Sequence, residues 1–362
     1  MQDDEEQGQR TSSSSQSSVA SFPTEFDFIN RLRERTALEA QHSQSQQSVA
    51  VGMGDDAAVI RTAGGKDTVI TTDLLVENID FRRRTTPAHL LGHKALAVSL
   101  SDIAAMGARP RWSLVSIGVP DDLWASEFAN DFYEGLLQLA TQYDVQLIGG
   151  DTSRTPEHVV IDSIVVGECA TDSAIKRSGA MPGDLVFVTG SLGGSAAGFR
   201  LIERGAHLAD QHLGATETQI LDQLLLRHLH PEPRVGWGMV LGQEKLVTAM
   251  IDLSDGLSSD LNHLCAESKV GALIQATLIP IDTQVVELCG RRALDPLQLA
   301  LHGGEDFELL FTVKPDAVGK LPKRVDGIGI TQIGEIRELK DGVKISEGSR
   351  VWDLTSRGWK HF

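Results

Sequence analysis

Carboxylates follow apolar runs at four places in the sequence, after a turn of Gly, Ser or Thr. These stretches read GMGDDAAV, VITTDLL, LIGGDTSR and MIDLSDG, and a fifth, SLSDIAAMG, carries an aspartate inside an otherwise apolar helical pattern. Carboxylates that meet in one cleft oppose each other's ionisation unless a cation neutralises them. Mg²⁺ prefers such hard oxygen ligands and retains phosphate oxygens in its shell. The pattern therefore favours a magnesium site that holds phosphates.

Each stretch also has a simpler interpretation. An aspartate beside a glycine is most often a turn residue that bonds its own backbone, and Ser254 alone could cap the helix that follows it. The hypothesis depends on the combination, because the folded chain could bring five acidic positions to one cleft. A protein that binds divalent cations without any chemistry would explain the same carboxylates, and this alternative stays open.

Other stretches suggest phosphate or cation recognition. GSLGGSAAG (190–198) is a Gly-rich turn that opens a helix, and its backbone N–H groups could hold an anion, although a plain strand–helix turn is the simpler interpretation. Arg177 precedes it and could offer a cation to a phosphate. HGGEDFELLF (302–311) places Glu305 where it could face a cationic substrate, or could protect an edge strand. The sequence contains neither the GxxxxGK[ST] pattern of a P-loop nor GxGxxG.

Composition narrows the class of protein. The chain has 362 residues, of which 41% are hydrophobic and 23% charged. Its net charge of −17 argues against binding to nucleic acid or anionic membrane. No apolar run approaches the roughly 18 residues that a membrane span needs. Three cysteines without CxxC spacing indicate a reducing compartment. We therefore expect a cytoplasmic protein with no membrane contact, and an acidic, Ser-rich disordered tail at residues 1–24.

The apolar segments alternate between strands and helices, which predicts a mixed α/β (α+β) fold. A helix is expected from Pro87 to just before Gly107, and the turn at 178–184 separates two lobes of similar size. Further helices are predicted at 124–142, 194–204, 216–229 and 257–267. Strands are predicted at 48–53, 57–61, 67–75, 112–119, 145–150, 158–169, 184–190, 248–253, 271–276, 307–313 and 328–336.

Seven stretches together resemble the thiamine-monophosphate kinase family, in that family's order and spacing, from about residue 26 to the end. They are GDDAAV, TTDLLVE, HKALAVSLSDIAAMGARP, LIGGDTSR, KRSGAMPGD, IDLSDGLSSDL and GGEDFEL. The wider superfamily includes aminoimidazole-ribonucleotide synthetase, selenophosphate synthetase and a hydrogenase-maturation protein, and all use ATP without a P-loop. The resemblance implies an N-terminal domain (25–175) that dimerises and binds ATP and Mg²⁺. It also implies a C-terminal α/β sandwich (176–362) that completes the nucleotide and substrate sites.

The resemblance implies an activity and a set of site residues. ATP and thiamine monophosphate would give ADP and thiamine diphosphate in a homodimer that binds several Mg²⁺ ions. The implied metal ligands are Asp56, Thr71, Thr72, Asp73, Asp102, Asp151, Asp252 and Asp255. The implied nucleotide contacts are Gly150, Asp151, Arg177, Ser254 and Tyr133, and the implied substrate contacts are Asp80, Glu305 and Trp359. Asp80 lies in NIDF, where many members carry a histidine in GVHF.

The acceptor is itself a phosphate, whose second pKa is about 6, so its oxygens need no general base. We expect direct in-line transfer between two mutually repelling phosphates. Selenophosphate synthetase and the hydrogenase protein are disfavoured, because they carry a functional cysteine near the N-terminus and at the C-terminus respectively. This chain has Cys169 as its first cysteine and ends in WKHF. The detailed motif match disfavours aminoimidazole-ribonucleotide synthesis, and a non-catalytic cation binder leaves Arg177 and the Gly-rich turn unexplained.

Overall fold

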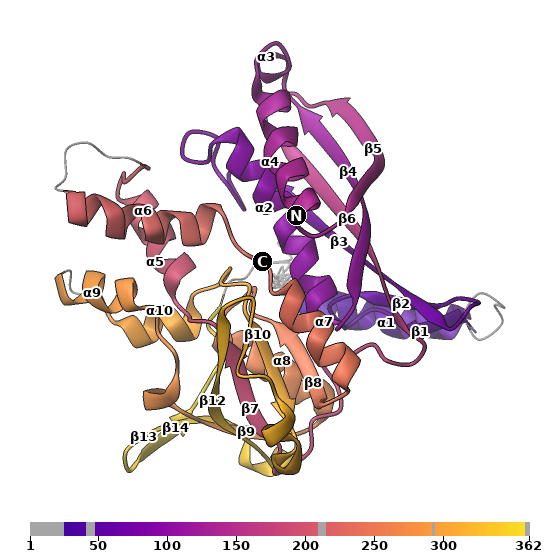
Figure 1. The fold of residues 1–362 in the computed structure, drawn as a ribbon, viewed down its shortest axis with the longest axis vertical. Helices are drawn as coiled ribbons and strands as arrows, with labels where there is room; N and C mark the ends of the chain where they lie inside the picture. Colours follow the sequence, from indigo (N-terminus) through magenta and orange to yellow (C-terminus); the bar gives the residue numbers. More distant parts are fainter. Residues whose placement is uncertain (1–24, 41–47, 209–214, 292–293, 359–362) are drawn as a thin grey trace, which may run out of the picture.

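Two mixed β-sheets form the two lobes of the computed structural model, which describes residues 25–40, 48–208, 215–291 and 294–358 (Figure 1). The predicted tail at 1–24 lies outside the described residues. The first sheet has the order β1-β2-β3-β6-β4-β5. Its strands are β1 (Val49–Val51), β2 (Ala58–Arg61), β3 (Lys66–Val76), β4 (Arg109–Val119), β5 (Gln146–Arg154) and β6 (Val160–Ala170). The helices of this lobe are α1 (Glu25–Ala40), α2 (Ala88–Ala105), α3 (Asp121–Trp124) and α4 (Phe128–Gln142).

Helices α2 and α4 cover one face of the first sheet. Glycines allow the two helix backbones to touch, since a Cβ on Gly92 would lie 1.8 Å from the carbonyl oxygen of Phe132. Strand residues alternate between the two faces, and β6 shows this as a regular alternation of buried and half-buried positions. The opposite face carries exposed apolar side chains, such as Leu74 at 61% and Trp112 at 37%. The first sheet therefore has one packed face and one open, partly apolar face.

The second sheet has the order β14-β13-β9-β12-β7-β10-β8, with β11 paired to β12. Its strands are β7 (Leu185–Thr189), β8 (Val247–Asp252), β9 (Gly271–Gln275), β10 (Leu309–Val313), β11 (Arg324–Val325), β12 (Ile328–Arg337), β13 (Val343–Glu347) and β14 (Arg350–Asp353). The helices are α5 (Gly194–Glu203), α6 (Ala215–Leu229), α7 (Val235–Glu244), α8 (Leu257–Ser268), α9 (Thr283–Arg291) and α10 (Pro296–His302). Short 3₁₀ helices are η2 (Ala276–Leu278), η3 (Pro315–Lys320) and η4 (Leu339–Asp341).

Helix α2 runs along the junction of the two lobes and belongs to both. Its residue Leu90 packs into the apolar cluster of α5, α6 and α9. At its other end, a Cβ on Gly238 of α7 would lie 2.3 Å from the carbonyl oxygen of Ala104. The main apolar core is continuous across the junction, because it includes Phe187 and Phe311 of the second sheet. Side chains of α2 that face the junction therefore meet the second lobe at successive turns.

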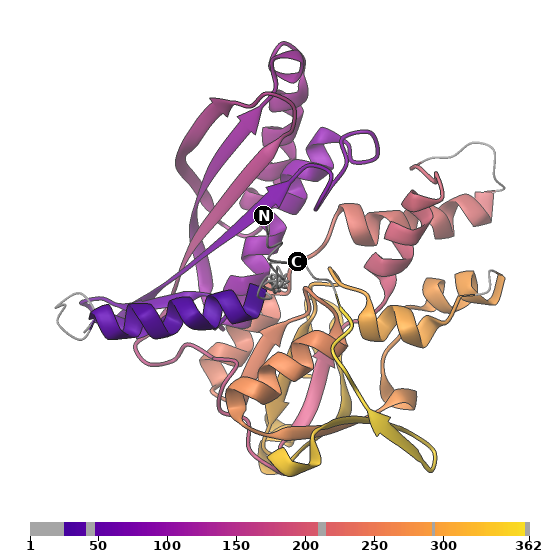
Figure 2. The same cartoon turned by 180° about the vertical axis from the view of Figure 1, so that it is seen from behind.

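Helix α1 braces the other side of the junction. Figure 2 shows it lying across the molecule between the first sheet and α8, and Arg33 Nη1 is 2.9 Å from Glu267 Oε1 of α8. The predicted helix at 124–142 is interrupted, since α3 ends at Trp124 and α4 begins at Phe128. Among the described residues, no helix combines the length and the apolar character that crossing a membrane requires.

Candidate active site

Three aspartates from distant parts of the chain meet at the lobe junction. Asp56 comes from the loop before β2, Asp102 from α2 and Asp252 from the end of β8, and one carboxylate oxygen of each lies within 4.8 Å of the others. Asp252 is only 1% exposed and Asp56 7%. The structure thus brings three of the predicted positions together where the two lobes meet.

Hydroxyl groups hold these carboxylates in place. Thr71 donates to Asp102 Oδ2 at 2.5 Å, and Ser101 donates to Asp252 Oδ2 at 2.7 Å. A fourth carboxylate, Asp73, accepts a hydrogen bond from Ser99 at 2.7 Å. Ser99 and Ser101 were not singled out by the sequence. Both serines lie within three residues of Asp102 in the stretch SLSD, but a search for charged residues alone does not select them.

Burial and mutual repulsion raise the pKa values of the cluster. Burial, then the charge of Asp56, raises the pKa of Asp252 to about 7. Burial, then the charges of Asp73 and Asp252, raises the pKa of Asp102 well above its usual range. Asp55 was not assigned a role, yet burial and the charge of Asp56 raise its pKa to about 7 as well. These shifts indicate a crowded negative site.

The guanidinium of Arg177 faces these carboxylates. Arg177 donates through Nη2 to Asp56 Oδ1 at 2.6 Å, and its backbone amide donates to Asp55 Oδ1 at 3.0 Å. The second oxygen of Asp56, Oδ2, is buried and has no hydrogen-bond partner among the described residues. A buried carboxylate oxygen normally has a partner. The donor set of hard oxygens, the surplus of negative charge and this unsatisfied oxygen therefore fit a divalent cation such as Mg²⁺.

The turn after β8 extends the site. Ser254 Oγ lies 3.4 Å from Asp252 Oδ1, and Asp255 follows on the same turn. Asp260, which the sequence did not single out, accepts a hydrogen bond from the amide of Gly256 at 3.0 Å and is 2% exposed. Burial, then the charges of Asp255 and Asp252, raises the pKa of Asp260. The predicted residues Asp252, Ser254 and Asp255 thus stand together, with Asp260 behind them.

Glu305 lies beside this turn. Its amide donates to the carbonyl of Ser254 at 2.7 Å, and its carboxylate forms an ion pair with Lys94 of α2 at 2.7 Å. His228 Nδ1 approaches the other carboxylate oxygen at 3.0 Å. Burial alone would raise the pKa of Glu305, but Lys94 and His228 outweigh it and lower the pKa to about 2. Glu305 is therefore ionised and fixed by both lobes.

The structure places two predicted residues, Thr72 and Asp151, on the opposite, open face of the first sheet. Thr72 alternates with Thr71 and Asp73, so its side chain points away from the cluster and donates to Asp162 at 2.6 Å. Asp151 pairs with Ser116 across the strands, and Ser116 pairs with Asp162. Gly150 and Asp151 both lie on the exposed edge strand β5. Asp162, missed because HVVIDSIVV reads as a plain strand, thus forms a second acidic row with Asp151.

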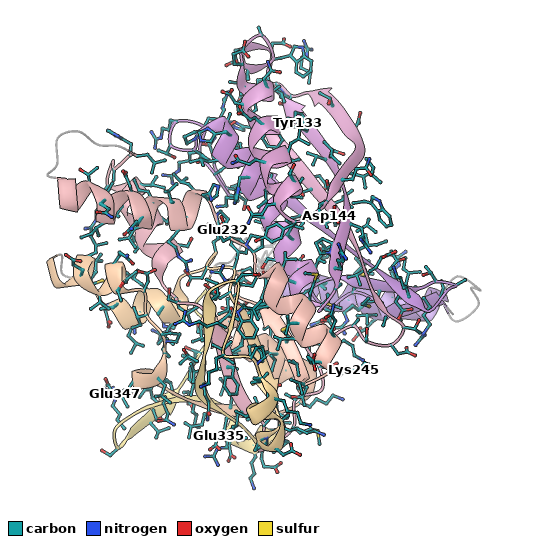
Figure 3. All side chains as sticks on the ribbon, in the orientation of Figure 1. Tyr133, Asp144, Glu232, Lys245, Glu335 and Glu347 are labelled. Carbon is teal, nitrogen blue, oxygen red and sulfur yellow. The ribbon has the colours of Figure 1, made fainter. Side chains whose placement is uncertain are left out.

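The remaining predicted residues lie farther from the cluster. Tyr133 is on α4 in the upper lobe (Figure 3), where its ring meets Phe132 edge-on at 5.3 Å between centroids. Asp80 lies in the turn after β3, and its carboxylate accepts a hydrogen bond from the amide of Val76 at 2.7 Å. Trp359 lies outside the described residues. Within one chain, the structure therefore gathers the aspartates at 56, 73, 102, 252 and 255 with Arg177, Ser254 and Glu305. Thr72, Asp80, Tyr133 and Asp151 lie elsewhere.

The Gly-rich turn at 190–198 does not hold a free set of amides. The amides of Gly193 and Ser195 donate to the carboxylate of Asp306 at 2.7 and 3.1 Å. The anion at this helix N-terminus is thus an internal side chain, as expected for the positive end of a helix. The interpretation of this turn as a phosphate site is wrong, and the simpler interpretation as a strand–helix turn is confirmed.

A second group of possible metal ligands lies near Lys94, comprising His93, His230 and Glu232. The two imidazole rings are stacked, with centroids 3.4 Å apart and planes inclined by 23°. Their lone pairs lie in the ring planes and run side by side, so they do not converge on one point. His93 Nε2 is also 2.8 Å from the carbonyl oxygen of Pro231. We therefore assign no metal to this group.

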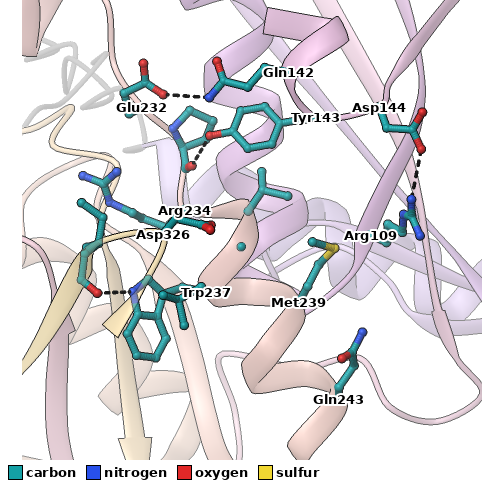
Figure 4. Close-up of a pocket in the computed structure, with 15 residues that line it drawn as sticks. Arg109, Gln142, Tyr143, Asp144, Glu232, Arg234, Trp237, Met239, Gln243 and Asp326 are labelled. Atoms are coloured by element: carbon teal, nitrogen blue, oxygen red, sulfur yellow. Dashed lines mark hydrogen bonds and ion pairs between the residues drawn. The ribbon is translucent and has the colours of Figure 1, made fainter. Parts of the chain in front are cut away.

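A pocket of ≈ 780 Å³ lies on another side of the lobe junction (Figure 4). Its lining comes from both lobes and contains no predicted site residue. Tyr143 Oη donates to the carbonyl of Pro233 at 3.1 Å, and Trp237 Nε1 donates to the carbonyl of Ile328 at 3.1 Å. Figure 4 shows the first bond joining α4 to the segment before α7. This pocket is a lobe contact separate from the acidic cluster.

Family models match both lobes. The model "AIR synthase related protein, N-terminal domain" matches residues 54–169, and the corresponding C-terminal domain model matches residues 181–345. Fold and site thus define a protein of the AIR synthase-related class. The chain belongs, within that class, to the thiamine-monophosphate kinase family, because curated members align with it over most of its length.

Two relatives and two solved structures show the extent of this similarity. Thiamine-monophosphate kinase of Bacillus subtilis is 37% identical over 93% of this chain and 99% of its own, and that of Escherichia coli is 36% identical over 93% and 98%. The structure described as AaThiL complexed with AMPPCP and TMP has a TM-score of 0.78 and 31% identity, covering 94% of this chain and 97% of that one. The Stenotrophomonas maltophilia enzyme has a TM-score of 0.70 and 37% identity, covering 90% and 98%.

A more distant structure shares the fold alone. The HypE–HypF complex matches with a TM-score of 0.64 at 18% identity and covers 89% of this chain. The expectation of a fold shared with a hydrogenase-maturation protein is confirmed. The resemblance to thiamine-monophosphate kinases noted from the sequence is likewise confirmed.

Proposed function

We propose that this protein transfers the γ-phosphate of ATP to thiamine monophosphate, giving ADP and thiamine diphosphate, by direct in-line transfer with the help of several Mg²⁺ ions. The buried cluster of Asp56, Asp102 and Asp252 carries the proposal, because its unsatisfied oxygen and its surplus charge call for divalent cations. The relatives support the reaction, since their names state it and the AaThiL structure is described with an ATP analogue and TMP.

The chain's own residues would orient the reactants. Mg²⁺ held by the cluster would supply positive charge to the oxygens of both phosphates. Arg177 lies at the edge of the same site, and Ser254 and Asp255 flank it on the β8 turn. Two unit charges 4 Å apart repel by about 4 kcal/mol at an effective dielectric constant of 20. Alignment and charge neutralisation therefore supply most of the catalysis, and the deprotonated acceptor phosphate needs no base.

The division of the chain into an N-terminal domain (25–175) and a C-terminal domain (176–362) belongs to the same proposal. In it, the first domain binds ATP and Mg²⁺, and the second completes both sites. Asp151 stands on the open face of the first sheet, where Thr72 donates to Asp162, and Gly150 precedes Asp151 on the exposed edge strand β5. These residues would join the nucleotide site through a second copy of the chain, and Tyr133 and Asp80 are retained as proposed contacts of nucleotide and substrate.

The open face of the first sheet supports the homodimer. Leu74 lies beside Asp162 across the strands and is 61% exposed. We expect the wild type to sediment as a dimer and Leu74→Glu as a monomer, because a second charge beside Asp162 repels the partner. Sedimentation velocity measures this. Leu339→Glu, at an equally exposed leucine of η4 in the other lobe, should remain dimeric. An unchanged dimer in Leu74→Glu would place the interface elsewhere.

Stability without metal should fall as the pH rises. The pKa of Asp252 is raised to about 7 and that of Asp73 to about 6, mainly by burial. A raised carboxyl pKa favours folding below its ordinary value near 4, and this contribution is lost as the pH rises through 6 to 7. With a chelator, we expect a lower melting temperature at pH 8 than at pH 5.5. Excess Mg²⁺ should remove most of this difference, and Asp252→Asn should reduce it. A melting temperature that does not change with pH in the presence of chelator would contradict the raised pKa values of these aspartates.

The function is tested by mixing the protein with ATP, Mg²⁺ and one phosphate acceptor at a time, and measuring ADP. Formation of ADP with thiamine monophosphate, dependent on Mg²⁺, supports the kinase. Formation of ADP only with an aminoimidazole-ribonucleotide precursor would indicate another reaction of the superfamily. No ADP with any acceptor would leave a protein that binds cations without chemistry. A labelled phosphoprotein during turnover would contradict direct transfer.

A further inference from the structure

Lys94 is a charged residue that the sequence analysis left without a role. It lies on α2, its side chain is 1% exposed, and its Nζ is 2.7 Å from Glu305 Oε1. A buried ammonium is costly unless an opposite charge compensates it. The amine is therefore committed to Glu305. It is also shielded from solvent, so it has no free face to offer to a phosphate.

Glu305 is fixed at three points. Lys94 holds Oε1, the amide of Glu305 donates to the carbonyl of Ser254, and His228 Nδ1 lies 3.0 Å from Oε2. A carboxylate only accepts hydrogen bonds, so His228 donates from Nδ1. Burial and the charge of Lys94 lower the pKa of His228, so this histidine is neutral near pH 7. Of the two side chains that hold the Glu305 carboxylate, Lys94 is therefore the one that carries a positive charge.

The Glu305 side chain is still 30% exposed, whereas that of Lys94 is 1% exposed, so a ligand can reach the carboxylate but not the amine. Its backbone φ is 61°. Such a positive φ is uncommon for a residue other than glycine and is often kept at functional sites. Thiamine monophosphate carries its phosphate on a two-carbon arm of the cationic thiazolium ring, and a neutral aminopyrimidine is attached on the other side of that ring. If the phosphate meets the aspartate cluster, the ring needs an anion at a distance from that cluster, and Glu305 is such an anion.

Resting on the proposed function, we propose that Lys94 is a positioning residue: it orients the Glu305 carboxylate toward the cationic ring of the acceptor and so determines affinity for that substrate. Lys94 itself touches neither substrate. Its removal should therefore weaken binding of thiamine monophosphate without changing the phosphate transfer. If Lys94 only held the two lobes together, its removal would change the KM values of both substrates. Steady-state kinetics therefore separates the two roles.

The test is steady-state kinetics of Lys94→Met, Glu305→Gln and the double variant, with each substrate varied in turn. We expect Lys94→Met to raise KM for thiamine monophosphate about tenfold or more, as for the loss of a charged hydrogen bond. Its kcat and its KM for ATP should stay within about twofold of the wild type. The double variant should match Glu305→Gln alone, because Lys94 acts through Glu305.

The controls keep the outcome interpretable. Tyr143→Phe removes another bond between the lobes, from Tyr143 to the Pro233 carbonyl, and should leave both KM values unchanged. If Lys94→Met does not fold, the double variant still tests the proposal, since it leaves no unpaired buried charge. A fall in kcat with unchanged KM, or effects of the two single changes that simply add, would overturn the proposal. A wild type that makes no ADP from thiamine monophosphate would instead refute the proposed function.

Discussion

Asp252→Asn is expected to lower kcat by about 10²- to 10³-fold or more, which is the scale for losing one electrostatic contact of a transition state. Asp252 is 1% exposed and shares the cluster with Asp56 and Asp102. Because burial and like charges raise its pKa to about 7, removing its charge should leave the melting temperature unchanged or higher. ADP release and thermal unfolding of the same preparation measure the two effects.

A matched control separates the site from burial in general. Asp184 is another buried aspartate, 3% exposed, whose carboxylate accepts hydrogen bonds from the amide of Met181 and from Thr248. Asp184→Asn should cost stability and keep kcat. An Asp252→Asn protein that retains more than a tenth of the activity would mean that the cluster is not the catalytic metal site.

Arg234→Met is expected to destabilise the fold by about 3–5 kcal/mol, the scale for breaking a buried ion pair by removing one partner. Arg234 donates to both oxygens of Glu308 at 2.5 Å, and Glu308 has no exposed surface. Removing the guanidinium leaves a buried carboxylate without its main partner. Glu308 keeps Thr189 at 2.7 Å and Arg227 at 3.5 Å as partners, and these contacts reduce the loss of stability. Urea unfolding at constant slope measures the difference.

Removing both charges should recover most of this loss. Arg234→Met combined with Glu308→Gln has no orphaned charge, so its stability should lie closer to that of the wild type. Arg154→Met breaks an exposed pair with Asp121 and should cost no more than roughly 0–1 kcal/mol. A loss for Arg234→Met alone that is no larger than this control would show that Arg227 or water compensates Glu308 fully.

Elements with a clear period were predictable from the sequence, and elements with glycine inside them were not. The long strands β3, β4 and β6 and the helix ending before Gly107 follow directly from alternation and from helical spacing. Helix α7 was missed because VGWGMVLGQE carries three glycines, which lower helix propensity. Two of them, Gly238 and Gly242, let α7 approach the backbone at the end of α2, and Gly236 lies against Asp326. Helices α1, α9 and α10 and strands β13 and β14 were also missed.

The site was predictable as a set of residues but not as a geometry. The sequence named Asp56, Asp102 and Asp252, and the structure brings them together. Side chains alternate along a strand, so Thr72 faces away from Thr71 and Asp73 and cannot join them in one site of the same chain. Contacts such as Lys94 with Glu305 join residues that are far apart in the chain. No local pattern encodes such a pair, because it arises only when α2 docks on the second lobe.

One helix, α2, carries both a member of the aspartate cluster and the lysine that holds Glu305. Lys94 and Asp102 both lie on α2, eight residues apart. That separation corresponds to about 12 Å of helix rise. A helix keeps this spacing rigid, so in the proposed function α2 would fix the distance between the aspartate cluster and the Glu305 carboxylate that Lys94 holds. A molecule that carries its phosphate nearer to its cationic ring, or farther from it, would then reach one of these two groups and miss the other. Part of the selectivity for acceptor length would follow from the rigidity of one helix.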